Sequence, residues 1–259
     1  LKRFPKYPRY RALKIAVCLV GSRKSYPDSE IEARRRHIET FASRGTQIEM
    51  IFPDEGTFWV EQPTEFDFLQ VMPYIVKRIV KAERDGFDAA LVNCIIDPGV
   101  DTARCVVDIP VLGPGRTAIH VASMLADKIG FFCPSKLVPH LYRFASSYGL
   151  SHFLHYVEPV DLGPTDFSDK KKAIEKGFRS FTQRAVNQGA QAAIPWGLPL
   201  LSAGGLDAKK LSKELKILVL DPHIYVRMAE ALVHMDITHS RLSYPSPPLN
   251  QIDSLLTSL

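Results

Sequence analysis

The sequence predicts an α/β protein built from two doubly wound parallel-sheet lobes related by a pseudo-twofold axis. Three observations lead to this fold class. Short apolar runs alternate with helical patterns, three of the runs recur later in the same order, and 259 residues suffice for two small domains with buried cores. Strands that alternate with helices form βαβ units, whose right-handed crossovers produce a parallel sheet covered on both faces.

The repeat consists of three pairs of segments, and the members of each pair are separated by about the length of one small domain. The pairs are 14–18 (KIAVC) with 128–132 (KIGFF), 86–94 with 189–197, and 109–114 with 217–222. Short apolar runs bounded by turn residues are typical of buried parallel strands. We therefore expect the paired segments to form equivalent strands of the two lobes.

Helical patterns fill the intervals between these strands. Apolar residues recur at helical spacing in 29–43, 68–84, 136–149 and 170–188. Gly149 and Gly189 stand where helix C-caps are expected. We divide the chain accordingly into a basic N-terminal arm (1–13), a first lobe (14–114 together with 222–259) and a second lobe (115–221).

Composition and charge argue against several classes of function. Much of the positive charge lies in short clusters at 2–11, 34–36 and 170–172, which are typical of tails or solvated helix faces, and no nucleic-acid motif accompanies them. No apolar run approaches the roughly 20 residues that span a bilayer. We expect neither a nucleic-acid nor a membrane partner.

The cysteine pattern argues against metal and disulfide sites. The four cysteines are Cys18, Cys94, Cys105 and Cys133, and they show neither CxxC spacing nor a small disulfide framework. The sequence thus predicts no metal site, and free thiols fit a reducing cytoplasm.

The repeat also predicts where the active site lies. In open parallel sheets, ligands bind beyond the carboxyl ends of the strands, and two facing lobes bring these ends together in an interlobe cleft. Cys94 and Gly197 occupy equivalent strand ends. We therefore expect a thiol on one side of the cleft and no side chain on the other.

The residues around Cys94 resemble a known sequence block. The segment 94–100 (CIIDPGV), followed by Ala103-Arg104 and by 109–113 (IPVLG), strongly resembles the block around the first catalytic cysteine of hydantoin racemases, in the aspartate/glutamate racemase superfamily. The segments 220–222 (LDP) and 229–233 (AEALV) support it, and the similarity covers about residues 14–248. It implies two lobes, a cofactor-free mechanism, and two cysteines that act on opposite faces of one carbon.

The chain departs from the pattern of this family at two places. Cys94 matches the first cysteine, but Gly197, between Trp196 and Leu198, stands where the second is expected. The family's Asn-Pro-Asn-Thr turn is replaced by 20–23 (VGSR). Arylmalonate decarboxylases of the same superfamily resemble this chain in having a single cysteine, although theirs belongs to the opposite lobe.

The chemistry implied by the resemblance suggests a set of candidate site residues. Removing a proton beside a carbonyl needs a base and a cradle for the enolate, and Cys94 can serve as the acid or base because a thiolate near a helix N-terminus is reactive. Cys133, His120 and His223 are candidates for a second acid or base, with core packing as the alternative interpretation. The candidates for substrate binding are Ser22, Asn93, Gly115, Arg116, Thr117, Ser135, Trp196 and Gly197.

Three functions follow from these candidates. The first is a cofactor-independent, racemase-like isomerase that acts on a small carboxylate or amide substrate derived from an amino acid. The second is a single-cysteine decarboxylase or lyase, and the third is a non-catalytic ligand-binding protein with a degenerate racemase site. No cofactor is expected, and the basic aromatic arm together with the two-lobed resemblance favours a homo-oligomer.

Overall fold

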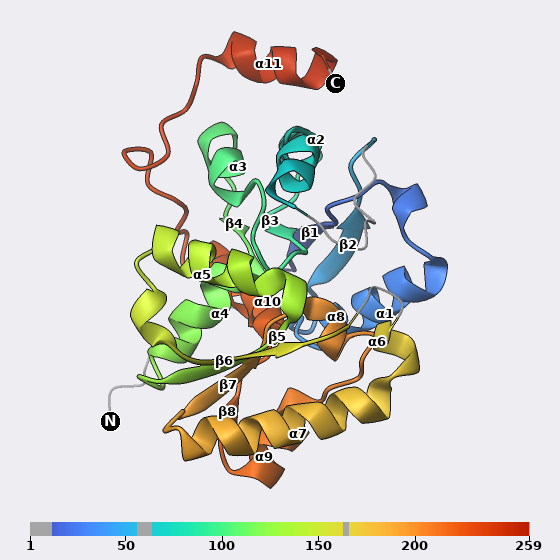
Figure 1. Ribbon diagram of the computed structural model, residues 1–259. Coiled ribbons are helices and arrows are strands. Elements are labelled where there is room, and N and C mark those ends of the chain that lie inside the picture. Colours follow the sequence, from blue (N-terminus) through green and yellow to red (C-terminus); the bar gives the residue numbers. More distant parts are fainter. Residues whose placement is uncertain (1–11, 56–63, 163–165, 259) are drawn as a thin grey trace, which may run out of the picture.

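Two four-stranded parallel sheets form the centre of the protein, as the computed structural model shows (Figure 1). The structure describes residues 12–55, 64–162 and 166–258. Most of the predicted N-terminal arm, residues 1–11, lies outside them. Among the described residues, no helix is both long and apolar enough to cross a bilayer.

The two sheets have the same strand order. In the first sheet the order is β2 (Gln47–Ile51), β1 (Lys14–Cys18), β3 (Ala89–Val92) and β4 (Val111–Leu112). In the second it is β6 (Leu154–Val160), β5 (Ile129–Pro134), β7 (Ala192–Pro195) and β8 (Leu218–Val219). The predicted segment pairs therefore take equivalent places: β1 corresponds to β5, β3 to β7 and β4 to β8. The predicted fold class is confirmed.

Helices connect the strands. In the first part of the chain they are α1 (Asp28–Glu39), α2 (Glu65–Arg84), α3 (Val100–Val106), α4 (Pro114–Ser123) and α5 (Val138–Ser147). In the second they are α6 (Asp166–Asp169), α7 (Lys171–Asn187), α8 (Leu198–Leu201), α9 (Ala208–Leu215), α10 (Tyr225–His234) and α11 (Leu249–Ser258). Short 3-10 turns are η1 (Arg23–Ser25), η2 (Ser135–Leu137), η3 (Ser151–Phe153) and η4 (Pro222–Ile224).

The helix ends follow local signals in the sequence. Thr64 caps α2 because its hydroxyl accepts the Asp67 N–H while the Asp67 carboxylate accepts the Thr64 N–H, so the helix begins three residues before the predicted 68–84. Gly149 and Gly189 follow α5 and α7 with φ of 68° and 93°, a left-handed conformation that favours glycine. Both C-cap predictions are confirmed.

Each sheet is buried on both faces, as its continuous apolar strands predict. In β1, Ala16 and Cys18 pack toward α2, while Ile15 and Val17 pack on the opposite face toward α10. In the second sheet one face packs on α4 and α5 and the other on α7 and α9. Alternate side chains of one strand point to opposite faces of the sheet, so every strand contributes to two cores.

The chain returns to the first lobe after β8. Helix α10 contacts β3 and β4, and α4 contacts both η4 and α10. Ile252 of α11 belongs to the same apolar cluster as α2 and α3. These contacts support the assignment of residues 222–259 to the first lobe, and the exact lobe boundaries stay a prediction.

Candidate active site

Cys94 lies directly after β3, at the carboxyl edge of the first sheet. The backbone N–H of Asn93 donates to the Cys18 carbonyl at 2.8 Å, which prolongs the ladder by one residue, and the chain then turns, with the Asp97 N–H donating to the Cys94 carbonyl at 3.0 Å. Cys94 is partly exposed, whereas Cys18 and Cys133 are fully buried. The turn therefore presents this thiol at the strand end.

Gly197 follows β7 at the equivalent edge of the second sheet. Its backbone is extended, a conformation that any residue adopts. An added Cβ would lie 3.5 Å from both the Leu200 Cδ1 atom and the Pro134 Cγ atom, which is ordinary van der Waals contact. Neither backbone strain nor packing around the Cβ position requires glycine here.

The two strand ends pack against each other across the lobes. Ile95 belongs to the same apolar cluster as Trp196 and Leu198, the neighbours of Gly197, and Ile96 packs on that cluster. The residues that follow Cys94 thus contact the core beneath Gly197. Cys94 itself packs on the apolar cluster of the first lobe, with residues of α2 and α3.

The surroundings of Cys94 favour a neutral thiol. Although the residue keeps partial exposure, burial raises the pKa of its thiol to about 12. The N–H groups of Ile96 and Ile95 and the Arg34 guanidinium act in the opposite direction, while the Asp97 carboxylate raises the pKa further. In this state the thiol is an acid, and it becomes a base only when the thiolate gains further stabilisation.

Asp97 holds the start of α4 against the Cys94 turn. Its carboxylate accepts the N–H groups of Gly115 and Arg116, each at 2.8 Å. Burial raises the pKa of the Asp97 carboxyl to about 7, against the lowering effect of these two amides. The backbone N–H groups of Gly115 and Arg116, two candidates for substrate binding, are therefore occupied by a carboxyl group of the protein itself.

Two glycines permit this contact. A Cβ on Gly113 would lie 2.2 Å from the Asp97 Cγ atom, and a Cβ on Gly115 would lie 2.0 Å from the Ile95 carbonyl oxygen. Both distances are far below van der Waals contact. Glycine at these positions lets α4 approach the turn after β3.

The side chains of Arg116 and Thr117 contact other groups of the protein. The Arg116 guanidinium lies 4.5 Å from the centre of the Tyr148 ring, 3.1 Å from the Tyr244 hydroxyl and 3.6 Å from the Asp101 carboxylate. The Thr117 hydroxyl donates to the Gly113 carbonyl at 2.7 Å, inside the first turn of α4. Both side chains make protein contacts that account for their positions.

Ser22, Ser135 and Trp196 lie near the strand ends in different environments. Ser22 follows β1 with its hydroxyl 3.4 Å from that of Ser25, and Ser135 follows β5 and donates to Asp161 at 2.6 Å. Trp196 is fully buried in the apolar core formed with Phe131 and Phe144. The two serines lie after the strands next to β3 and β7, whereas the indole lies in the core.

The three candidates for a second acid or base lie in three different places. Cys133 is sealed in the core of the second lobe, and burial raises the pKa of its thiol. His120 is exposed on α4 and lines a cavity of about 400 Å³ together with Arg104 and Tyr244. His223 is fully buried, and its Nδ1 atom lies 2.8 Å from the Asp221 carboxylate.

Arg34 is a site residue that sequence reasoning missed. The cluster 34–36 was predicted to be a solvated helix face, but Arg34 is only 6% exposed. Its guanidinium donates to Glu30 at 2.8 Å and to the Asn93 side-chain oxygen at 2.9 Å. The sequence does carry a signal for the burial of Arg34: it precedes the apolar Ile38 by four residues, and residues four apart share one helix face.

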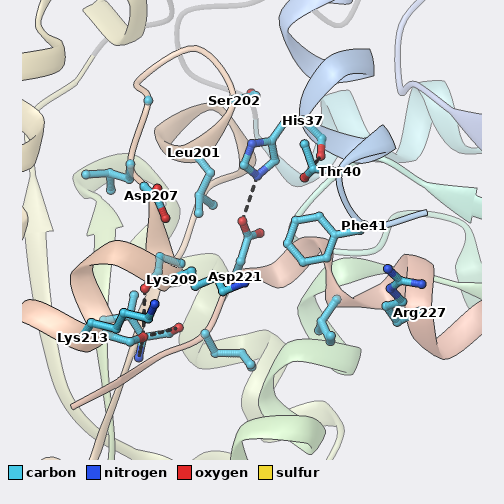
Figure 2. Close-up of a pocket in the computed structure, with 17 residues that line it drawn as sticks. His37, Thr40, Phe41, Leu201, Ser202, Asp207, Lys209, Lys213, Asp221 and Arg227 are labelled. Carbon is cyan, nitrogen blue, oxygen red and sulfur yellow. Dashed lines mark hydrogen bonds and ion pairs between the residues drawn. The ribbon is translucent and has the colours of Figure 1, made fainter. Parts of the chain in front are cut away.

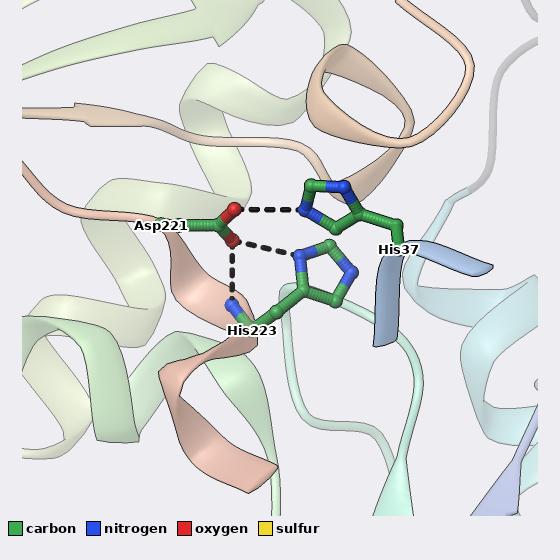
Figure 3. A group of neighbouring side chains, drawn as sticks. All are labelled: His37, Asp221 and His223. Carbon is green, nitrogen blue, oxygen red and sulfur yellow. Dashed lines mark hydrogen bonds and ion pairs between the residues drawn. The ribbon is translucent and has the colours of Figure 1, made fainter. Parts of the chain in front are cut away.

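Asp221, His37 and His223 form a polar cluster between the lobes. One carboxylate oxygen lies 2.8 Å from His37 Nε2, and the other lies 2.8 Å from His223 Nδ1 and also accepts the His223 backbone N–H (Figure 3). His37 belongs to α1 of the first lobe, and Asp221 follows β8 of the second. A cavity of about 1050 Å³ lies beside His37 and Asp221, next to α9 (Figure 2).

This group has the donor atoms of a metal site. The ligand atoms of His37, Asp221 and His223 lie within 4.8 Å of one another, and two imidazoles with a carboxylate suit a transition metal. The nearby His residues hold the pKa of Asp221 well below its usual range in spite of burial. The carboxylate is thus ionised and accepts from both rings, and these hydrogen bonds account for the geometry.

Comparisons with known proteins agree with the geometry. The family described as Asp/Glu/hydantoin racemase matches residues 44–224. A hydantoin racemase from Pseudomonas sp. (strain NS671) is 30% identical over 211 residues, covering 80% of this chain and 82% of that protein. A hydantoin racemase from Paenarthrobacter aurescens is 28% identical over 247 residues, covering 92% and 99%.

Solved structures show the same fold. An allantoin racemase from Klebsiella pneumoniae superposes with a TM-score of 0.79 at 22% identity, covering 91% of this chain and 95% of that chain. A liganded mutant of arylmalonate decarboxylase superposes with a TM-score of 0.58 at 9% identity, covering 90% and 97%. The resemblance predicted from the Cys94 block is confirmed. This chain belongs to the Asp/Glu/hydantoin racemase family and is an enzyme of that superfamily.

Proposed function

We propose that this enzyme is a cofactor-independent isomerase that removes and returns a proton at a carbon beside a carbonyl, with Cys94 as the acid and base. The observation that carries the proposal is the partly exposed Cys94 thiol at the carboxyl end of β3, with the next residue, Ile95, in the apolar cluster that holds Trp196 and Leu198 on either side of Gly197. In open parallel sheets this edge is where ligands bind.

The substrate class follows from the relatives. The matched proteins are named hydantoin racemases and allantoin racemases. Allantoin and the 5-substituted hydantoins are cyclic amides whose stereogenic ring carbon carries a hydrogen next to a ring carbonyl. We infer a substrate of this kind, small enough for an interlobe site.

The proton transfers can be assigned to one thiol and water. The Cys94 thiolate takes the proton from the carbon, and the electron pair of the C–H bond moves into the enolate. Because Gly197 leaves the opposite face without a side chain, a water molecule there donates a proton to that face and becomes hydroxide. The Cys94 thiol then releases its proton to neutralise the hydroxide, which restores the thiolate and gives the inverted product.

A decarboxylation is the second candidate, and Gly197 is the observation that favours it. When a carboxylate leaves as CO2, the electrons of the broken C–C bond form the same enolate, and one proton completes the product. A neutral Cys94 thiol can supply that proton without a second thiol.

A homo-oligomeric state and a cytoplasmic location stay predictions.

The test uses enantiopure 5-substituted hydantoins and arylmalonates in heavy water. Proton NMR follows deuterium entering the carbon, polarimetry follows inversion, and CO2 release follows decarboxylation. Replacing Cys94 by serine should reduce the active reaction by about 100-fold or more, the usual contribution of a general acid or base. Below the thiol's raised pKa of about 12, the rate of racemisation should rise with pH as the thiolate fraction grows.

Cys105→Ser is the matched control, because Cys105 is the other partly exposed thiol among the described residues. It should keep wild-type rates. If the Cys94→Ser enzyme exchanges deuterium as fast as the wild type, Cys94 is not the base and the proposal fails.

A further inference from the structure

We propose that Arg34 is the positioning residue of the Cys94 thiol: it anchors the strand-end turn through Asn93 and stabilises the thiolate by its charge. This inference rests on the proposed role of Cys94. It assigns a task to a buried cation that lies outside the segment 94–113 from which the resemblance was read.

The anchor is a chain of hydrogen bonds that ends next to the thiol. The Arg34 Nη1 atom donates to the Asn93 side-chain oxygen at 2.9 Å, and the Asn93 side-chain nitrogen donates to the Tyr225 hydroxyl at 3.0 Å. The backbone N–H of Asn93 is held by the Cys18 carbonyl at 2.8 Å. Since both ends of the amide and the main chain are bound, the next residue, Cys94, has a defined position.

The electrostatic side of the proposal depends on all charged and titratable groups around Arg34. Glu30 on the same helix pairs with it at 2.8 Å, and the Tyr26 ring lies 5.6 Å from the guanidinium carbon. The positive charge lowers the pKa values of Cys94, Tyr26, Tyr225 and His223. At Cys94, Tyr26 and Tyr225, burial is the largest effect and raises the pKa, and the charge of Arg34 opposes it. This opposition acts at the strand end where the proposed mechanism needs an anion.

Stability alone does not explain this arginine. Removing a guanidinium from water costs free energy, and a buried ion pair is frequently no better for stability than apolar packing. The Arg34 side chain is 7% exposed and that of Glu30 is 15% exposed, so both have lost most of their hydration. A charge that remains in such a place acts strongly on its neighbours, because salt and water screen it little.

The experiment measures the reactivity of the thiol, which does not require turnover. The full-length protein is alkylated with iodoacetamide over a range of pH, and peptide mass spectrometry quantifies the modification of Cys94. In Arg34→Gln alkylation of Cys94 at any fixed pH well below the thiol pKa should slow about tenfold, as a rise of one unit in that pKa requires. Arg34→Lys should recover at least half of this shift, because it keeps the charge but loses the fork of donors.

Arg35→Gln is the matched control on the same helix, because 44% of the Arg35 side chain is exposed, against 7% for Arg34, and it pairs with Glu32 and Glu39. It should leave the Cys94 profile unchanged. Equal profiles for Arg34→Gln and the wild type, with the fold verified by circular dichroism, would overturn the proposal.

A second variant keeps Arg34 in place. Glu30→Gln removes its counter-charge but keeps an acceptor, so the pKa of Cys94 should fall and its alkylation at the same pH should speed up. This variant tests the proposal even if Arg34→Gln does not fold, and an alkylation rate that stays the same or falls overturns the proposal. Loss of turnover in Cys94→Ser tests the proposed function separately, since alkylation reports on the thiol whether or not it is catalytic.

Discussion

At the scale of single residues, the proposed site rests on a thiol and a hydrogen atom at equivalent strand ends. Cys94 follows β3 and Gly197 follows β7, and the neighbours of both lie in one apolar cluster. The extended backbone and the 3.5 Å contacts of a Cβ at Gly197 leave room for a side chain. The asymmetry therefore reflects chemistry at the site more than a packing constraint.

This argument makes a prediction about Gly197→Cys. The variant should fold normally and should racemise the substrate at least about tenfold faster, because a second thiol replaces water as the donor on the opposite face. Polarimetry on an enantiopure hydantoin measures the rate. Gly197→Ser is the control, since it adds a Cβ with a far weaker acid; a folded Gly197→Cys enzyme no faster than Gly197→Ser would contradict the assignment of the two faces.

At the scale of elements, the site depends on how α4 meets the turn after β3. Asp97 has φ of 53°, and its carboxylate binds the two N–H groups at the helix start. Gly113 and Gly115 allow this approach because a Cβ on either one would overlap the turn. The position of Cys94 is thus coupled to the first turn of the helix that leads into the second lobe.

Replacing Gly115 by alanine should disturb both stability and activity. Its Cβ would meet the Ile95 carbonyl, so the free energy of unfolding should fall by about 1–3 kcal/mol, and turnover should fall with it because the turn must move. Urea unfolding and racemisation assays measure the two effects. In Gly177→Ala, inside α7, the new Cβ would lie 3.5 Å from Phe132, and this variant should instead gain about 0.5–1 kcal/mol; equal effects of the two changes would contradict the argument.

At the scale of the whole molecule, polar pairs join the two lobes at separate places. Asp221 after β8 accepts from His37 of α1, and Glu65 at the start of α2 pairs with His140 and Arg143 of α5. Asp221 is largely buried, whereas the Glu65 and Arg143 side chains are mostly exposed. The Asp221 contact is therefore the one expected to contribute more to the stability of the interlobe arrangement.

Asp221→Asn should destabilise the protein and flatten its response to acid. The pKa of Asp221 is lowered in the folded state, so its stabilising effect is present above its unfolded pKa and disappears as pH falls through the folded value. Loss of the charged acceptor should cost about 1.5–3 kcal/mol near neutral pH, measured by urea unfolding at several pH values. The control Asp253→Asn removes an exposed pair with Arg84 and should cost less than about 1 kcal/mol; equal losses would show that the interlobe contact is weak.

Particular residues show how far the sequence alone reaches. The helix ends at Gly149 and Gly189 and the equivalence of β3 with β7 could be predicted, because caps, turns and strand periodicity depend on neighbours in the chain. The position of Cys94 after β3 could be predicted as well, whereas its catalytic role stays a prediction. The partners of Gly115 and Arg116 could not, because Asp97 reaches them across 18 and 19 residues.

The sequence by itself determined the two-lobed architecture and the family, and it placed Cys94 and Gly197 after equivalent strands. Only the tertiary structure decided that Arg34 is buried beside Asn93, 59 residues away, and that His37 meets Asp221, 184 residues away. The reason is physical. Local patterns determine which faces of a helix or strand are apolar, but the electrostatics of a site depend on which distant segments share a region from which water is excluded.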